Sequence, residues 1–178
     1  MNNQEEENRE LLDLLANKKY KYVLKKIISS KDYKKNAFKL AVLAQTYDAK
    51  NDLVKATESY NDSLKLSEKP EIRLLFIDVL LRSQNIIKAK DELEKLNPDQ
   101  FEKPTSLINY ANLQASVGNN DKSIEIFEKI RKQLLDNNLI KDDLIINQII
   151  EVSLQICRLY FRLGNYGKAF GNISLALK

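Results

Sequence analysis

The sequence predicts an all-α protein built from a row of antiparallel helix hairpins. The 178 residues include only 4 Gly and 3 Pro, fewer turn residues than a β-sheet protein of this length needs to connect its strands. Self-comparison also finds one pattern of helix, turn and helix several times along the chain. Apolar residues make up 43% and charged residues 30%, which is the composition of a folded globular domain.

The repeat is clearest in residues 110–127 and 156–173, which align without a gap. Both segments pass from an apolar helix through a Gly-Asn pair into a second helix. Residues 43–60 and 76–93 keep the same register, and a weaker copy lies near the N-terminus. We therefore expect a single repeat domain over residues 1–178. Its approximate units are 4–35 (degenerate), 37–69, 70–103, 104–137 and 150–178, with a helix extension at 138–149.

The extension follows from the spacing of matched small residues in the second helices. Successive intervals between Ala56, Ala89, Ser123 and Ala169 are 33, 34 and 46 residues, so the last unit is too long. Helical apolar spacing continues on both sides of residues 137 and 138, which predicts lengthened helices that meet there. Asp142 and Asp143 should then lie in the first turn of the following helix, where negative charge is favoured.

Small residues also recur in the first helices, at Ala44, Ala111 and Cys157. Two antiparallel helices approach closely only where one of them presents a small side chain, beside which a bulky neighbour fills the gap. Gly118 and Gly164 stand where a helix should end in a left-handed residue. In the turns of the two earlier copies we expect Asn51 and Asn85 to serve, because asparagine tolerates that conformation next best.

These residues resemble the tetratricopeptide repeat (TPR), whose pattern places a small residue and an aromatic in each helix of the hairpin. The aromatic positions hold Tyr47 and Tyr160 in first helices, and Tyr60 and Phe127 in second helices. The resemblance covers nearly the whole chain, in about five units of which the first is a degenerate cap. It implies a right-handed α-solenoid, a TPR-like superhelix in which each hairpin covers the open apolar face of the one before.

In the TPR family, the first helices line a concave surface along which another protein binds. The resemblance thus implies a protein-interaction scaffold or adaptor, of which a chaperone-like role is one form, with a partner peptide or helix in the groove. An equally weighted alternative is that some apolar lining residues are simply core. The family's clamp for a C-terminal carboxylate is not expected, because its positions hold Ala41, Gln45, Leu75, Thr105 and Asn109. The expected groove residues are Phe38, Val42, Gln45, Leu75, Asp78, Arg82, Asn109, Asn112, Gln155, Arg158 and Arg162.

An enzyme is not expected, because the chain contains no histidine, the commonest general base and zinc ligand. Cys157 occupies a small-residue position, so we interpret it as a buried packing residue. The stretch from Gly164 to Ala169 only superficially resembles a phosphate-binding loop, because it has the wrong glycine spacing and follows a helix. We expect no metal and no cofactor.

One alternative function lies in the basic segment Lys18 to Lys35, which carries eight lysines and one aspartate. Its lysines and tyrosines could bind nucleic acid or an anionic surface, although a solvated helix face is the simpler interpretation and a nucleic-acid partner is disfavoured. The polar N-terminus and the single cysteine predict a cytoplasmic protein without a membrane span. Since the chain stops inside a repeat helix, a third possibility is the repeat portion of a larger protein that self-associates through an uncapped C-terminal repeat.

Overall fold

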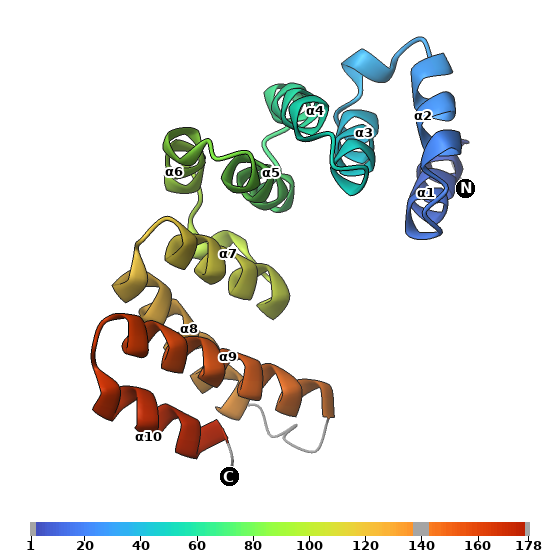
Figure 1. Ribbon diagram of the computed structural model, residues 1–178. Helices are drawn as coiled ribbons and strands as arrows, with labels where there is room; N and C mark the ends of the chain where they lie inside the picture. Colours follow the sequence, from blue (N-terminus) through green and yellow to red (C-terminus); the bar gives the residue numbers. More distant parts are fainter. Residues whose placement is uncertain (1–2, 137–142, 177–178) are drawn as a thin grey trace. The chain divides into compact units, whose positions relative to one another are not determined.

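The computed structural model describes residues 3–136 and 143–176, which contain α-helices and short 3-10 turns and no strand (Figure 1). The chain divides into two compact units, α1 to α6 and α7 to α10, which we describe separately. In the first unit, the helices are α1 (Asn3–Ala16), α2 (Tyr20–Ser29), α3 (Ala37–Ala49), α4 (Leu53–Leu66), α5 (Pro70–Arg82) and α6 (Ile86–Glu94). In the second, they are α7 (Pro104–Ser116), α8 (Asn120–Asp136), α9 (Asp143–Arg162) and α10 (Tyr166–Ala176).

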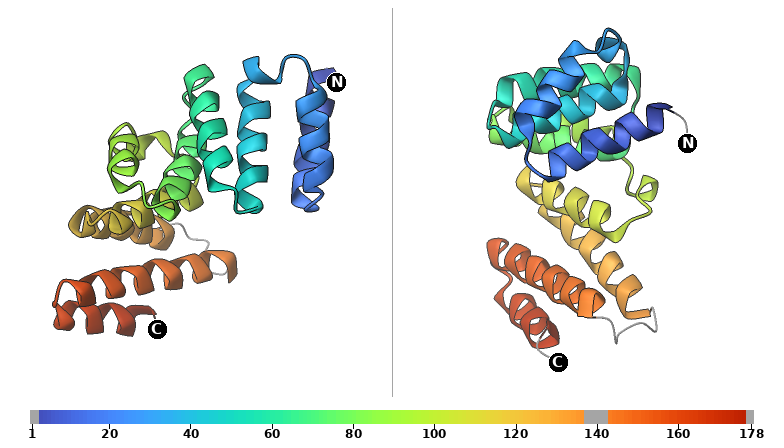
Figure 2. Two further views of the ribbon diagram at one scale, coloured as in Figure 1. Left: turned by 45° about the horizontal axis from the view of Figure 1, so that its top comes forward. Right: turned by 90° about the vertical axis from the view of Figure 1, so that its right-hand side faces the viewer.

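Consecutive helices pack against each other in both units. In the first unit α3 packs on α4, α4 on α5 and α5 on α6, while α1 packs on both α2 and α3. In the second unit α7 packs on α8, and α9 lies between α8 and α10 (Figure 2). Each unit is therefore a stack of hairpins in which most contacts are local in sequence.

Five hairpins share one turn geometry, in which a residue with positive φ ends the first helix. These residues are Lys18, Asn51, Gln84, Gly118 and Gly164, with φ of 56°, 59°, 61°, 94° and 72°. The N–H of the residue after each donates to a carbonyl five residues earlier, at 2.8–2.9 Å, which is the Schellman arrangement. The intervals between these residues are 33, 33, 34 and 46 residues, so the degenerate N-terminal copy keeps the turn of the others.

The prediction for the turns was correct at Asn51, Gly118 and Gly164 and wrong by one residue at Asn85. Gln84 adopts the left-handed conformation instead, whereas Asn85 has φ −88° and is the N-cap of α6. Its side-chain oxygen accepts a hydrogen bond from the Lys88 N–H at 3.4 Å. Capping a helix contributes about 1 kcal/mol, so the asparagine has a use at this position that glutamine cannot supply.

The second unit contains the two longest helices, α8 with 17 residues and α9 with 20. α9 begins inside the stretch predicted as a helix extension and continues without interruption to Arg162. Asp143 lies in its first turn, as predicted, while residues 137, 138 and 142 lie outside the described part of the chain.

The small residues allow close helix packing in the way the repeat requires. Ala44, Ala56, Ala89, Ala111 and Ser123 are all fully buried. Large side chains fill the space beside them, and the rings of Tyr60 on α4 and Phe76 on α5 lie 6.2 Å apart. Packing of this density explains why the small residues cannot be exchanged for larger ones without moving a helix.

α9 is the single helix in the described ranges that is long and apolar enough to cross a membrane, by length and composition alone. Its most apolar 18-residue stretch has a mean hydropathy of 1.3, and 22% of that stretch is buried. It packs against α8 and α10.

The register can be tested by overpacking one helix pair. We expect Ala56→Leu to lower the free energy of unfolding by about 1–3 kcal/mol, because the fully buried Cβ faces α3 across a closely packed interface. Urea unfolding followed by circular dichroism measures the change. The matched control is Ala49→Leu at the exposed end of α3, which should leave stability within about 0.5 kcal/mol of the wild type. Equal effects of the two substitutions would contradict the register.

Candidate functional site

The predicted groove residues of the first unit divide into core and surface. Val42 is 1% exposed and belongs to an apolar cluster with Leu11, Val23 and Ile27, so it is a core residue that no partner can reach. The alternative interpretation of the apolar lining positions therefore holds for Val42. It fails for Leu75, which is 39% exposed on α5. Phe38 lines a hollow of about 360 Å³ beside α4, and Gln45 is partly exposed on α3.

Asp78 and Arg82 lie one turn apart on the exposed face of α5 and form an ion pair. The Arg82 Nε lies 2.9 Å from an Asp78 carboxylate oxygen, and Nη2 lies 2.5 Å from Asp48 on α3. Burial lowers the pKa of Arg82, but the two carboxylates outweigh it and raise that pKa overall. This part of the first unit therefore holds a cation that already has two anionic partners.

The second unit brings four of its predicted residues together around one pocket. A cavity of about 100 Å³ lies between α7 and α9, lined by Asn112 from α7 and by Gln155, Arg158 and Arg162 from α9. The buried side chains of Phe127 and Leu159 also line it. Asn109 is exposed one turn before Asn112. The pocket is hence a small cavity with amide and guanidinium groups over apolar carbon.

The two arginines of this pocket differ from the charged pair on α5. In the repeat alignment, Arg158 and Arg162 occupy the positions of Asp78 and Arg82. Neither arginine forms an ion pair with any residue that the structure describes, whereas Arg82 forms two. Like charges one turn apart on a helix repel by a few tenths of a kcal/mol. The pocket thus holds positive charge that no carboxylate in the described part of its unit pairs with.

The structure resembles solved proteins of known fold over most of its length. PilF of Pseudomonas aeruginosa matches with a TM-score of 0.69 and 14% identity, over 97% of this chain and 74% of that one. MamA matches with a TM-score of 0.61 and 23% identity, over 89% of this chain and 82% of that one. Both are TPR proteins. The fold is that of the tetratricopeptide repeat.

The sequence comparisons add nothing to this structural similarity, since no protein-family model and no curated protein matches the sequence significantly. The predicted fold class, an all-α TPR-type α-solenoid, is confirmed. At these identities the similarity establishes the TPR fold alone, and function has to be argued from the surface of this chain.

Two residues considered for chemistry have clear positions. Cys157 is partly exposed, so the prediction of a buried cysteine was wrong, whereas Ala44, Ile77 and Ala111 at the same repeat position are fully buried. Gly164 is the left-handed turn residue of its hairpin, and Lys168 lies over the ring of Tyr160, 5.2 Å from its centroid. No group of three potential metal ligands occurs in the described ranges.

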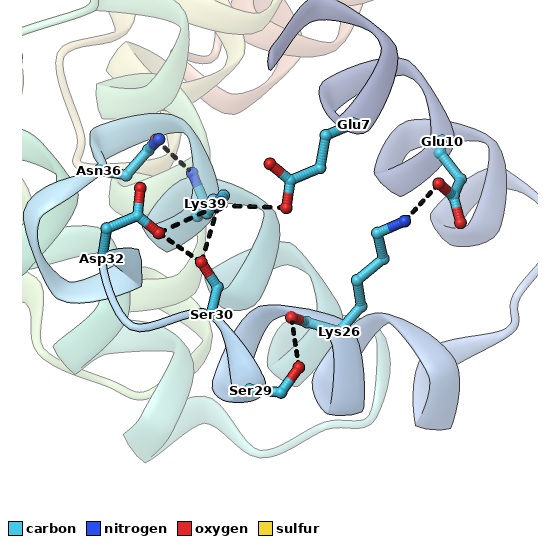
Figure 3. A network of polar contacts seen from close by, with 8 residues as sticks. All are labelled: Glu7, Glu10, Lys26, Ser29, Ser30, Asp32, Asn36 and Lys39. Atoms are coloured by element: carbon cyan, nitrogen blue, oxygen red, sulfur yellow. Dashed lines mark hydrogen bonds and ion pairs between the residues drawn. The ribbon is translucent and has the colours of Figure 1, made fainter. Parts of the chain in front are cut away.

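The basic segment from Lys18 to Lys35 faces an acidic helix. Lys26 of α2 pairs with Glu10 of α1 (Figure 3). α1 also carries Glu5, Glu6 and Glu7, so its carboxylates offset part of the positive charge beside them. This arrangement favours the solvated-face interpretation of the segment over a phosphate-binding one.

A buried lysine that the sequence did not single out lies at the end of the basic segment. Lys39 of α3 is 4% exposed, and its Nζ lies 3.1 Å from Glu7 of α1, 3.1 Å from Asp32 and 2.8 Å from the Ser30 hydroxyl (Figure 3). Burial lowers the pKa of Lys39, but the bonds to Glu7 and Asp32 raise it overall. Hydrogen bonds from Ser30 and then Lys39 lower the pKa of Asp32. The network joins α1 and the loop after α2 to α3.

Removing this lysine should loosen the N-terminal hairpin. We expect Lys39→Met to lower the free energy of unfolding by about 1–3 kcal/mol at pH 7, because charge-assisted hydrogen bonds are lost while the apolar stem is kept. Urea unfolding measures it, with Lys21→Met on the exposed face of α2 as the matched control.

The pH dependence of that difference gives a second test. The folded pKa of Asp32 is lowered, so Asp32 stabilises the fold at pH values above its ordinary pKa of 3.8. This stabilisation is lost as the pH falls below that value. The folded pKa of Lys39 is raised, so Lys39 stabilises the fold at pH values below its ordinary pKa of 10.5. This stabilisation is lost as the pH rises past that value. The stability difference between wild type and Lys39→Met should therefore be greatest between these limits. A difference that is independent of pH would contradict the assigned network.

Proposed function

We propose that this protein is a protein–protein interaction scaffold whose first helices hold a segment of another protein. The observation that carries the proposal is the pocket between α7 and α9, where residues from two successive first helices converge. TPR-fold neighbours favour the same class of function, because stacked first helices offer an extended surface. A chaperone-like role and an adaptor role are both forms of this proposal.

The groups on these helices suit a peptide or helix from a partner. Asn109, Asn112 and Gln155 carry amides that can both donate to and accept from a peptide backbone. Exposed apolar side chains, Leu75 on α5 and Leu154 on α9, offer places for apolar side chains of the partner within each unit. A catalytic role has no comparable support, since no histidine is present to act as a general base.

The cytoplasm is the proposed compartment, because a single cysteine suits a reducing environment. Binding of nucleic acid through the basic segment remains the alternative proposal, and the acidic α1 beside that segment weakens it.

An affinity pull-down with mass spectrometry tests the groove. We expect at least one protein to be enriched by the wild type and to be reduced roughly tenfold with the double variant Asn112→Ala, Arg158→Glu, because a difference of about 1.4 kcal/mol in binding already gives that factor. Lys132→Glu on the exposed face of α8 is the control, since it makes the same charge change outside the pocket. Equal recovery by the wild type and the double variant would contradict groove binding.

A second candidate function, self-association, is favoured by the exposed face of α10. At the second aromatic position of the repeat, the side chains of Tyr60, Leu93 and Phe127 are buried. Ile173 at the same position is 38% exposed. Phe170 beside it is 73% exposed, and Tyr166 stacks edge-on against Phe161 with ring centroids 5.2 Å apart. In the hairpins α3–α4 and α7–α8, the second helix that carries this position packs against the following first helix, α5 or α9.

We propose that the occupant of this face is the same face of a second copy of the chain. Beside the bulky row of Tyr166, Phe170 and Ile173 runs a row of small residues that includes Gly167 and Gly171. A Cβ added at either glycine would meet no other atom within 4 Å, so a second helix has room to approach. Bulky and small rows on one helix are self-complementary about a twofold axis. Lys168 is the single charged side chain among the described residues of α10, so little charge would be desolvated.

Sedimentation equilibrium over micromolar concentrations tests this pairing. We expect the wild type to form a dimer with a dissociation constant on the order of micromolar, as small interfaces do. Phe170→Glu should remain monomeric because it would bury a charge in the interface. Ile87→Glu, at an equally exposed apolar residue of α6, should dimerise like the wild type. A monomeric wild type, or a Phe170→Glu dimer of unchanged affinity, would refute the proposal.

A further inference from the structure

The unpaired arginines on α9 have an internal comparison in the same chain. At the matching positions of α5, an aspartate and an arginine neutralise each other, and Asp48 supplies a second carboxylate. On α9 both positions are arginine, and no carboxylate in the described part of the second unit pairs with either. The helix dipole favours Arg162 in the last turn, but it does not explain a second positive charge one turn earlier.

The surroundings of the two guanidinium groups also resemble a recognition site. Asn112 and Gln155 line the same cavity, and their side-chain amides add neutral hydrogen-bond donors. The buried Phe127 and Leu159 restrict water on the other side of the cavity. A volume of about 100 Å³ gives room for a small group such as a side-chain carboxylate.

We propose that this pocket binds the carboxylate of an acidic residue on the partner protein, with Arg158 and Arg162 donating to its oxygens. The proposal rests on the scaffold function above and specifies the chemistry of the segment that is bound. Guanidinium groups bind carboxylates through paired, charge-assisted hydrogen bonds, which supply specificity as well as energy. Asn112 and Gln155 would donate to a remaining oxygen lone pair or to an adjacent peptide carbonyl.

A carboxylate fits the pocket better than the phosphates of a nucleic acid. Nucleic-acid binding needs a run of cations that follows the phosphate backbone, with aromatic side chains on which bases stack. The cavity has two cations and is closed on one side by buried side chains. Its amides and small volume instead suit a single planar anion.

The test is an NMR titration that observes the Nε–Hε signals of the arginines. The probe is N-acetyl-glutamic acid α-amide, which carries one side-chain carboxylate, and its neutral match is N-acetyl-glutamine amide. We expect the first to shift the Arg158 and Arg162 signals saturably, with a dissociation constant on the order of millimolar, and the second to leave them unchanged. Arg82, which is already paired with two aspartates, serves as the control within the same spectrum.

Further arms separate the possible sources of the anion. N-acetyl-alanine carries a free α-carboxylate, so tighter binding of this probe would assign the pocket to a chain terminus. Inorganic phosphate binding more tightly than either carboxylate would overturn the proposal in favour of a phosphate ligand. Absence of a saturable shift at tens of millimolar probe, or equal shifts at Arg82, would also overturn it. Replacing Arg162 by Gln should remove the saturable shift at Arg158.

The outcome is separable from that of the scaffold proposal. If the titration fails while the pull-down still depends on Asn112 and Arg158, a partner binds the groove without a carboxylate at this pocket. If the titration succeeds while the double variant recovers the same proteins as the wild type, the pocket binds carboxylates but is not where the partner binds.

Discussion

Close approach of paired helices at fully buried small residues is the constraint on which the rest of this structure depends. Ala56 and Ala89 in the first unit, and Ser123 in the second, each allow a neighbouring helix to come near enough for large side chains to interlock. Because this contact recurs from repeat to repeat, successive hairpins within a unit present equivalent faces. The first helices then expose equivalent positions, and differences among those positions determine what each unit can bind.

The sequence predicted the fold from spacing, but it could not predict every position within it. The intervals between small residues were enough to place the hairpins and the long helices α8 and α9. The turn at Asn85 was misassigned by one residue, because asparagine is favoured both in left-handed backbone and at a helix N-cap. The register of residues 76–93 against 110–127 places Gln84 opposite Gly118, so the alignment could have identified the turn residue. Cys157 was expected to be buried because it occupies a small-residue position of the repeat, yet its side chain is partly exposed.

The sequence predicted which residues lie on the first helices, but it did not predict how buried each one is or which charges pair. Gln155, Arg158 and Asn112 meet at one cavity because the repeat register places them on facing helices. Val42 is a core residue because it packs against side chains of α1 and α2. The position of Val42 in its own repeat does not predict that packing. The buried ion pairs were also missed. Arg73 of α5 joins Glu92 of α6 across 19 residues, and Lys39 joins Glu7 across 32. Each of these two cations stands between apolar residues, which is a local signal of burial, but the distant partner left none.

The five helix-ending residues also differ between the units in a way that affects their conformational entropy. In the first unit they are Lys18, Asn51 and Gln84, and side chains other than glycine pay roughly 1–2 kcal/mol to occupy left-handed backbone. Gly118 and Gly164 in the second unit avoid that steric penalty but lose more freedom when the chain orders. The steric penalty therefore falls mainly on Lys18 and Gln84, since asparagine tolerates left-handed backbone better than they do. Replacing either of these two residues with glycine would exchange a steric penalty in the folded state for a larger loss of backbone freedom on folding.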